Sequence, residues 1–191
     1  MNYRFRRLFP LGFLAIAMMI FPAAASAKPT KTLPLAIRLN GGLTLTPTDD
    51  GRVQIKADMS GAGKHLGLAK AEAVWSAPQT AIKDLESGVI QELNIGAGSL
   101  NATIANGSSV SGTFSGRLVR LASGRIGHES TFVINGGSGN FAGSSGSGFM
   151  RGEADTKSLR FQLDISGSLV WQRPPFSRPP VKSNSSFKKA G

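Results

Sequence analysis

The chain has 191 residues, of which 40% are hydrophobic and none is cysteine, and its formal net charge is +11. The absence of cysteine excludes thiol catalysis and disulfide cross-links, so a folded domain must be held together by its core. The length between the two basic ends allows one domain with a sizeable core and is too short for two.

The first 27 residues have the three regions of a secretory signal peptide. Residues 1–7 carry three arginines and no acid, residues 8–21 are uncharged and mostly apolar, and Ala25-Ser26-Ala27 is a small-residue cleavage site. An uncleaved membrane anchor is the alternative, because residues 8–27 are just long enough to span a bilayer. Prolines and a glycine inside this run favour cleavage. We therefore expect a signal peptide over 1–27 and an exported protein, periplasmic or extracellular.

Most of the positive charge lies at the two ends of the chain. Residues 28–35 form a polar leader with two lysines, and residues 173–191 carry five cations, four prolines and no acid. The second segment predicts a disordered, basic, proline-rich tail. Export argues against nucleic acid as its partner, whereas anionic envelope polymers or lipid head groups would attract it; a merely solvated tail is the alternative. Residues 36–172 are close to neutral.

Short runs of alternating hydrophobic and polar residues fill 36–172. Val53, Ile55 and Ala57 alternate with charged and polar residues over 52–58, which is typical of a half-buried strand. Asn106-Gly107 indicates a hairpin turn. Strands are expected over 36–45, 52–58, 66–75, 88–95, 99–104, 110–121, 127–134, 149–155, 159–165 and 169–171. Only 76–85 favours a helical turn. Taken together, these ten runs amount to about eight strands joined by short turns, which predicts an all-β domain, either a single antiparallel β-barrel or a sandwich.

One glycine-rich stretch, residues 131–153, is the most distinctive part of the domain. Its motif consists of Gly136, Gly137, Gly139, Phe141, Gly143, Gly146 and Gly148. Glycines between two strands allow positive φ and close backbone contacts, so we expect a tight, bulged strand connection in which Phe141 anchors the loop to the core. A phosphate-binding loop is the alternative, but the lysine motif and the following helix that such loops need are missing.

The glycine motif also carries a resemblance. INGGSGNFAGSSGSG resembles the GGTGxFxGAxGxG signature of the allene oxide cyclase and dirigent β-barrel superfamily, closest to exported bacterial members. Residues 64–67, KHLG, and residues 100–113, LNATIANGSSVSGT, are similar to two further segments of those proteins. The likeness covers about 36–171 and implies the barrel rather than the sandwich. The catalytic glutamate, proline and asparagine of the cyclases, and the tyrosine of dirigent pockets, have no counterpart that aligns here.

Few side chains outside the motif suggest chemistry. His65 and His128 are the two histidines, and they would bind zinc only if the fold joined them to an acid such as Glu129. We expect both at the surface or rim, and no metal. Five carboxylates lie on expected strands: Glu72, Glu92, Glu129, Glu153 and Asp164. They point outward and pair with lysine or arginine, or one of them turns inward and acts as an acid or base.

Two functions follow from these observations. The first is an exported small β-barrel that needs no cofactor, carries out no catalysis, and binds a small apolar ligand or has a structural role in the envelope. The alternative is an isomerase or cyclase acting on an apolar substrate inside the barrel. A small barrel is filled by its own side chains or holds one small ligand, so the lining of the interior discriminates between these functions.

Overall fold

The computed structural model describes residues 30–64 and 66–172. The predicted signal peptide, the basic tail over 173–191 and His65 lie outside the described residues. No helix in the described part of the chain is long and apolar enough to cross a membrane.

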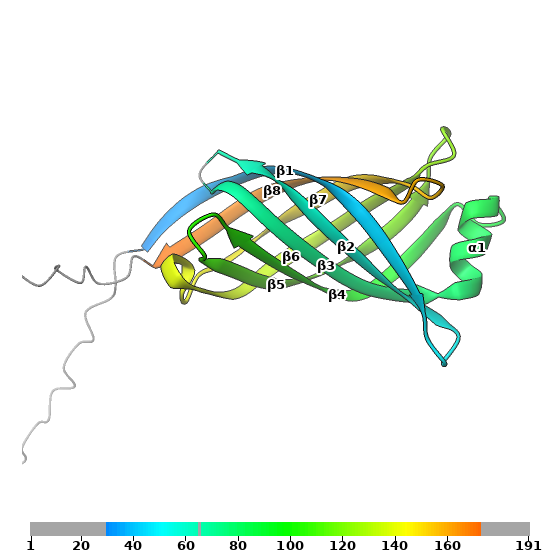
Figure 1. Cartoon of the computed structure of the whole chain (residues 1–191), viewed down its shortest axis with the longest axis horizontal. Helices are drawn as coiled ribbons and strands as arrows, with labels where there is room; N and C mark the ends of the chain where they lie inside the picture. The colour runs from blue at the N-terminus through cyan, green and yellow to red at the C-terminus, as the bar shows by residue number, and fades with distance from the viewer. Residues whose placement is uncertain (1–29, 65, 173–191) are drawn as a thin grey trace, which may run out of the picture.

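Eight antiparallel strands form one closed barrel in which each strand pairs with the next and β1 pairs with β8 (Figure 1). The strands are β1 (Thr30–Pro47), β2 (Arg52–Gly63), β3 (Gly67–Pro78), β4 (Glu92–Ile104), β5 (Ser109–Arg120), β6 (Ile126–Ser138), β7 (Ser145–Asp155) and β8 (Arg160–Gln172). Closure leaves no free sheet edge along the paired length. The predicted all-β single barrel is confirmed.

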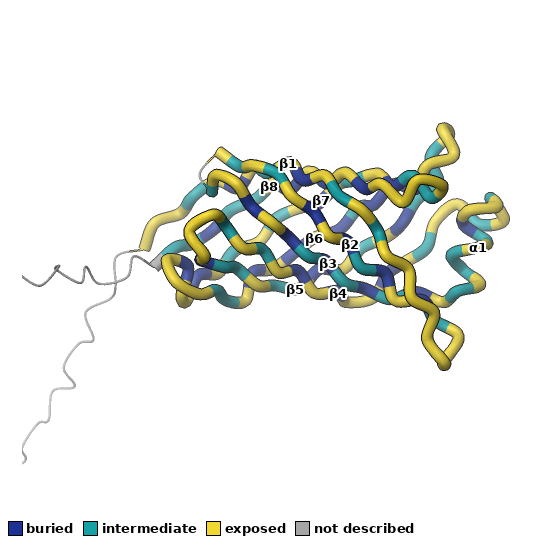
Figure 2. The backbone as a smooth tube through the Cα atoms, in the orientation of Figure 1, coloured by how far each residue is buried: buried dark blue, intermediate teal, exposed yellow. Residues whose placement is uncertain are grey.

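Alternation along each strand separates the core from the surface. In β2, Val53, Ile55, Ala57 and Met59 are buried while the residues between them face outward. Figure 2 shows the same alternation of buried and exposed positions around the barrel. Because side chains of a strand point to opposite faces with a period of two, each hydrophobic set lines the interior. Ridges of polar residues remain on the outside.

The start of β1 differs from the prediction. β1 begins at Thr30, so most of the segment predicted as a polar leader is a strand, with Leu33, Leu35 and Ile37 on its inward face. Pro34 obscured this pattern. It lies where β1 pairs with β8 alone, because pairing with β2 begins at Ile37. Proline is tolerated in a strand where its missing N–H has no partner strand to reach.

The two segments predicted separately over 88–95 and 99–104 belong to one strand. β4 runs from Glu92 to Ile104 with a bulge between Ile95 and Gly98. A Cβ atom at Gly98 would lie 2.7 Å from Cε1 of Phe114. Glycine at this position therefore leaves room for the outer end of the Phe114 ring beside the β4 backbone.

The two ends of the barrel differ. At one end, α1 (Gln79–Ser87) connects β3 to β4 and lies over the opening of the barrel (Figure 1). It lies where the sequence predicted a helical turn, over 76–85. We call this the helix end. The opposite end carries the β2–β3, β4–β5 and β6–β7 connections and the start of β1 and end of β8. We call it the glycine end, because the glycine motif lies there, in the β6–β7 connection with its short helix η1 (Gly139–Phe141) and in the adjoining ends of β6 and β7.

α1 is attached to the barrel by few contacts. Leu85 is its one buried residue, and Gly88, with φ 86°, ends the helix in the left-handed conformation. The Arg120 guanidinium on β5 donates hydrogen bonds to the carbonyl oxygens of Leu85 and Glu86. A cation at a helix C-terminus satisfies carbonyls that have no partner within the helix.

Candidate functional site

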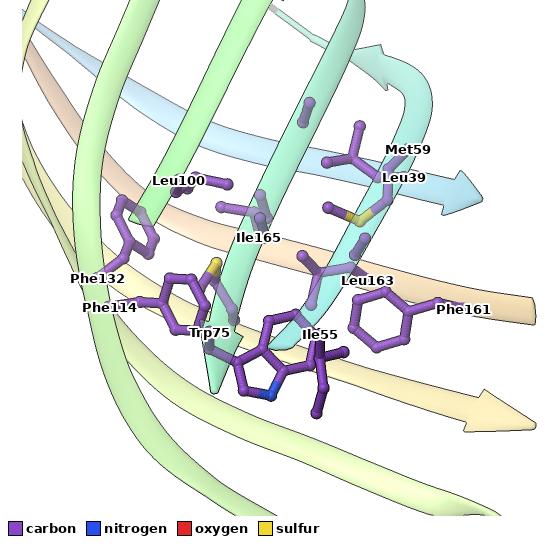
Figure 3. Close-up of a cluster of buried hydrophobic side chains, with 14 of the residues drawn as sticks. Leu39, Ile55, Met59, Trp75, Leu100, Phe114, Phe132, Phe161, Leu163 and Ile165 are labelled. Atoms are coloured by element: carbon purple, nitrogen blue, oxygen red, sulfur yellow. The ribbon is translucent and has the colours of Figure 1, made fainter. Parts of the chain in front are cut away.

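Side chains fill the middle of the barrel. Leu39, Met150, Leu163 and Leu169 are 0–1% exposed, and Figure 3 shows Leu39 and Leu163 among the inward side chains that meet there. An eight-stranded barrel is just wide enough for such packing. The interior is therefore a core rather than a channel, and free space occurs only towards the two ends.

The first space, the glycine-end hollow, has a volume of ≈ 40 Å³. Its wall is apolar apart from one serine of β5 and includes Ala69, Ala71, Leu100 and Phe132, with Leu66 and Phe141 from the connecting loops. Alanines on β3 leave the space that larger residues would fill. The volume is far below the about 300–1,000 Å³ of drug-sized ligand sites, so any guest must be small.

The second space, the helix-end hollow, has a volume of ≈ 50 Å³ and lies beneath α1. Its lining includes Ile82 and Leu85 of α1 and Trp75, His128 and Phe161 of the barrel. No residue lines both hollows. Four inward residues stand between them along their strands: Ala73, Phe114, Ser130 and Leu163. The barrel thus holds two separate small hollows divided by packed side chains.

Aromatic rings form the floor of the helix-end hollow. The His128 and Trp75 rings are stacked, with centroids 5.6 Å apart and an interplanar angle of 9°. Phe114 meets both rings edge-on, and Phe161 lies 5.9 Å from His128. Offset stacking and edge contacts of this kind stabilise aromatic clusters beyond their buried area.

The expectation that His128 lies at the surface or rim is wrong. His128 is 3% exposed, neither ring nitrogen has a hydrogen-bond partner, and burial lowers the pKa of the imidazole from 6.5 to about 4. The imidazole is therefore neutral at neutral pH. Glu129 follows it in β6 and points to the other side of the sheet. Within residues 30–64 and 66–172, no three histidine or acidic side chains gather as a metal site.

The burial of His128 follows from the strand period. Ile126, Phe132 and Ile134 of β6 share its inward face, and all have the same parity in the sequence. Counting that parity through 127–134 would have placed His128 inside the barrel. Its polar character concealed this, because histidine is found at the surface as readily as in the interior.

All five strand carboxylates face outward and pair with cations. Lys56 binds Glu72, Arg117 binds Glu92 and Glu129, Arg125 binds Glu153, and Arg38 binds Asp164. The Arg117 guanidinium holds the pKa of Glu129 below its ordinary value, and Arg38 does the same for the pKa of Asp164. The outward, ion-paired interpretation is confirmed. None of the five reaches either hollow as an inward acid or base.

The glycine motif folds over the glycine-end hollow. Four of its glycines extend the strands: Gly136 and Gly137 in β6, and Gly146 and Gly148 in β7. The connection itself is accordingly shorter than expected, and Gly139 and Gly143 have positive φ, 58° and 73°. No glycine of the motif opens a helix that would bind phosphate, since η1 has three residues.

Phe141 closes the loop onto the core. It is 6% exposed, and its ring centroid lies 6.4 Å from that of Trp171. The Trp171 indole N–H donates to the carbonyl of Asn140, whose own N–H donates to Ser108 Oγ over 3.0 Å. The loop is thus joined to β8 and to the β4–β5 connection.

The three segments that carry the sequence resemblance meet at this end. Leu66, Val110 and Phe141 come from the three segments in turn, and all three line the glycine-end hollow. Positions far apart in the chain therefore build one wall. Alternate connections of an antiparallel meander lie at the same end, and closure of the barrel then brings side chains from the three segments around one hollow.

Comparison with known proteins found similar solved structures, among them those of two dirigent proteins. Searches of family models and of curated proteins found no match. The chain is similar to the structures of the pterocarpan synthase dirigent proteins GePTS1 and PsPTS1, each with a TM-score of 0.49, at 11% and 12% identity. The matches cover 82% and 76% of this chain and 100% and 97% of theirs. The closed barrel itself is shown by the pairing of β1 with β8.

Proposed function

We propose that this protein is an exported β-barrel that binds a small apolar ligand in the glycine-end hollow without converting it. The supporting observation is the apolar wall of that hollow, which includes Ala71, Leu100 and Phe132. An apolar guest gains about 25 cal/mol for each Å² of its surface that leaves water. No buried charge opposes it there.

The size of the guest follows from the hollow. A volume of ≈ 40 Å³ is well below the about 150 Å³ of an apolar cavity that binds benzene, so the walls must move outward to admit a small hydrocarbon. Leu66 is half-buried and Phe141 sits at the loop end of the same space. These two side chains belong to connections rather than to strands, and connections move more readily than paired strands. We propose that they yield to admit the guest.

Binding without turnover is supported by where the ionisable groups lie. Catalysis of isomerisation or cyclisation needs an acid or base within hydrogen-bond reach of the substrate. The five carboxylates considered for this role are paired outside the barrel, and His128 lines the other hollow. We also propose that the protein is exported, which the signal-peptide pattern of residues 1–27 supports. An anionic partner for residues 173–191 is part of the same proposal and is supported by their five cations.

The binding step is tested by titrating the mature protein with benzene and following methyl resonances by NMR. We expect shifts of the methyl groups that line the hollow, among them those of Leu100 and Ile134, and none for Leu118, which lines the other hollow. Ala71→Leu should fill the space and abolish the shifts, as should the milder Ala102→Val. Ala36→Leu, on the exposed face of β1, is the control and should bind as the unaltered protein does.

Two results would overturn this function. Unchanged methyl resonances at saturating benzene would leave the barrel with a structural role in the envelope. Conversion of a fatty acid, terpenoid or phenolic compound, detected by product analysis and abolished by replacing a single acidic residue, would establish the isomerase or cyclase alternative.

A further inference from the structure

The helix-end hollow contains buried polar atoms without partners. The indole Nε1 of Trp75 and both ring nitrogens of His128 are buried and make no hydrogen bond, although the two side chains are only 5% and 3% exposed. Buried polar groups in native proteins nearly always have a partner. Both side chains line the same hollow, so that space is the candidate place for a partner. Ser130 Oγ, on the next inward position of β6, is buried and without a partner as well.

The chemistry of that partner follows from the atoms it must meet. An indole N–H only donates, whereas a neutral imidazole has one donor and one acceptor nitrogen. A hydroxyl group matches one atom of each residue, because its oxygen accepts from the Trp75 indole N–H and its hydrogen is donated to the acceptor nitrogen of His128. The N–H on the other ring nitrogen of His128 is left for a second acceptor. A carboxylate fits poorly, since His128 is neutral there and burying an unpaired charge is costly.

The rest of the wall selects an apolar body for the same molecule. Ile55, Leu118 and Phe161 line the hollow around the two polar residues. At its rim, Leu45 and Leu159 are 40% and 37% exposed. The other two polar residues of the lining, Glu86 and Thr156, lie at the rim and are not buried.

Leu159 marks this rim in a second way. It is the one non-glycine residue with positive φ, 54°, in the described part of the chain. Its carbonyl accepts a hydrogen bond from the N–H of Leu43, which also lines the hollow. Leu159 is the last residue of the β7–β8 turn, and its left-handed conformation holds the leucine side chain at the mouth of the hollow.

We infer that the helix-end hollow is a second binding site, which takes a small neutral alcohol with an apolar body. Trp75 donates to the hydroxyl oxygen and His128 accepts the hydroxyl proton. This site shares no residue with the glycine-end hollow. It therefore goes beyond the proposed function and can be tested independently of it.

The test uses the two indole N–H resonances of the intact mature protein. Benzyl alcohol is titrated against ¹⁵N-labelled protein, with toluene as the isostere that lacks the hydroxyl. We expect the Trp75 indole resonance and the His128 ring nitrogens to shift with the alcohol. Toluene should bind about tenfold more weakly, a factor at the upper end of what one hydrogen bond supplies. Trp171, whose indole already donates to Asn140, is the internal control.

Variants separate this site from the other hollow. His128→Phe keeps a ring in the aromatic cluster and should reduce the preference for alcohol over toluene, leaving the part that the Trp75 N–H supplies. Ala71→Leu should leave alcohol binding unchanged. The inference is overturned if the Trp75 and His128 resonances stay in place at saturating alcohol, which would mean that the space holds water only, or if toluene binds as tightly as the alcohol.

Discussion

Phe141 connects a single side chain to the stability of the glycine end. It is buried between the hollow and Trp171, whereas Phe149 on the outer face of β7 is 62% exposed. We expect Phe141→Ala to lower the free energy of unfolding by ~3–5 kcal/mol, the usual cost of truncating a buried phenylalanine. Denaturant unfolding followed by circular dichroism measures the loss. Phe149→Ala is the matched control, and equal effects of the two changes would contradict the anchor.

Gly137 is required for close backbone contact rather than for positive φ, the two roles that the sequence allowed for the motif glycines. It is absent from the positive-φ glycines; instead, an added Cβ would overlap the carbonyl oxygen of Ser109 and lie 2.7 Å from that of Phe141. We expect Gly137→Ala to cost about 1–3 kcal/mol through overpacking. Thermal unfolding measures the cost.

The neighbouring glycine provides the control for this prediction. A Cβ at Gly136 would meet nothing closer than Ser111 Oγ at 3.9 Å. Gly136→Ala should therefore change the free energy of unfolding by no more than about 0.5 kcal/mol. A larger loss at Gly136 than at Gly137 would show that backbone conformation, not close contact, decides both positions.

At the scale of elements, the hydrophobic period predicted most strands and missed the places where backbone contacts decide. The β2 alternation around Ile55 was readable because one face is buried and the other is in water. The start of β1 was missed because Pro34 interrupts its pattern, and β4 was divided at the glycine that accommodates Phe114. Proline and glycine mark local geometry, and only the neighbouring strand shows whether that geometry ends a strand.

α1 has a single buried side chain, Leu85, so its stability should respond to a single change. We expect Arg120→Met to speed amide hydrogen exchange in α1 while exchange in the strands stays slow, because the variant removes the donor to the Leu85 and Glu86 carbonyls. Hydrogen exchange read by mass spectrometry measures this. Arg160→Met, on the exposed start of β8, should leave α1 unchanged. Equal protection in both variants would contradict the attachment.

At the scale of the whole molecule, the sequence predicted the barrel but only part of its interior. The outward carboxylates followed from strand parity and from nearby arginines such as Arg117. The two hollows did not, because they depend on which side chains meet after β1 closes on β8. Whether Ala71 leaves a space is decided by residues from five other strands across the barrel, and none of those meetings is local in the sequence.

The buried imidazole makes the stability of the barrel depend on pH. The pKa of His128 is lowered from 6.5 to about 4 by burial, so the unfolded chain binds its proton more tightly than the folded one. The free energy of unfolding is therefore unaffected by His128 above pH 6.5. It falls by roughly 1.4 kcal/mol per pH unit as the pH drops from 6.5 towards 4, because His128 must be protonated only on unfolding. Urea unfolding at several pH values measures this slope.

A variant distinguishes His128 from the carboxylates in this pH range. The pKa values of Glu129 and Asp164 are lowered from ordinary values near 4, so their contributions are lost at lower pH. His128→Phe should therefore make the free energy of unfolding nearly independent of pH between about 6.5 and 4.5. The loss of stability at still lower pH, where the carboxylates take up protons, should remain. A slope that survives the substitution would assign it to another group.

The pairing of Thr30 with Gln172 has a consequence for the connectivity of the chain. Because the first and last described residues are neighbours on the glycine end, a short linker between them would allow circular permutation, with new termini in the turn at Asp50 and Gly51 on the opposite end. All eight strands and every inter-strand pair would be retained. Any domain fused to either natural end of the barrel would, for the same reason, be presented beside the glycine-end hollow and away from α1.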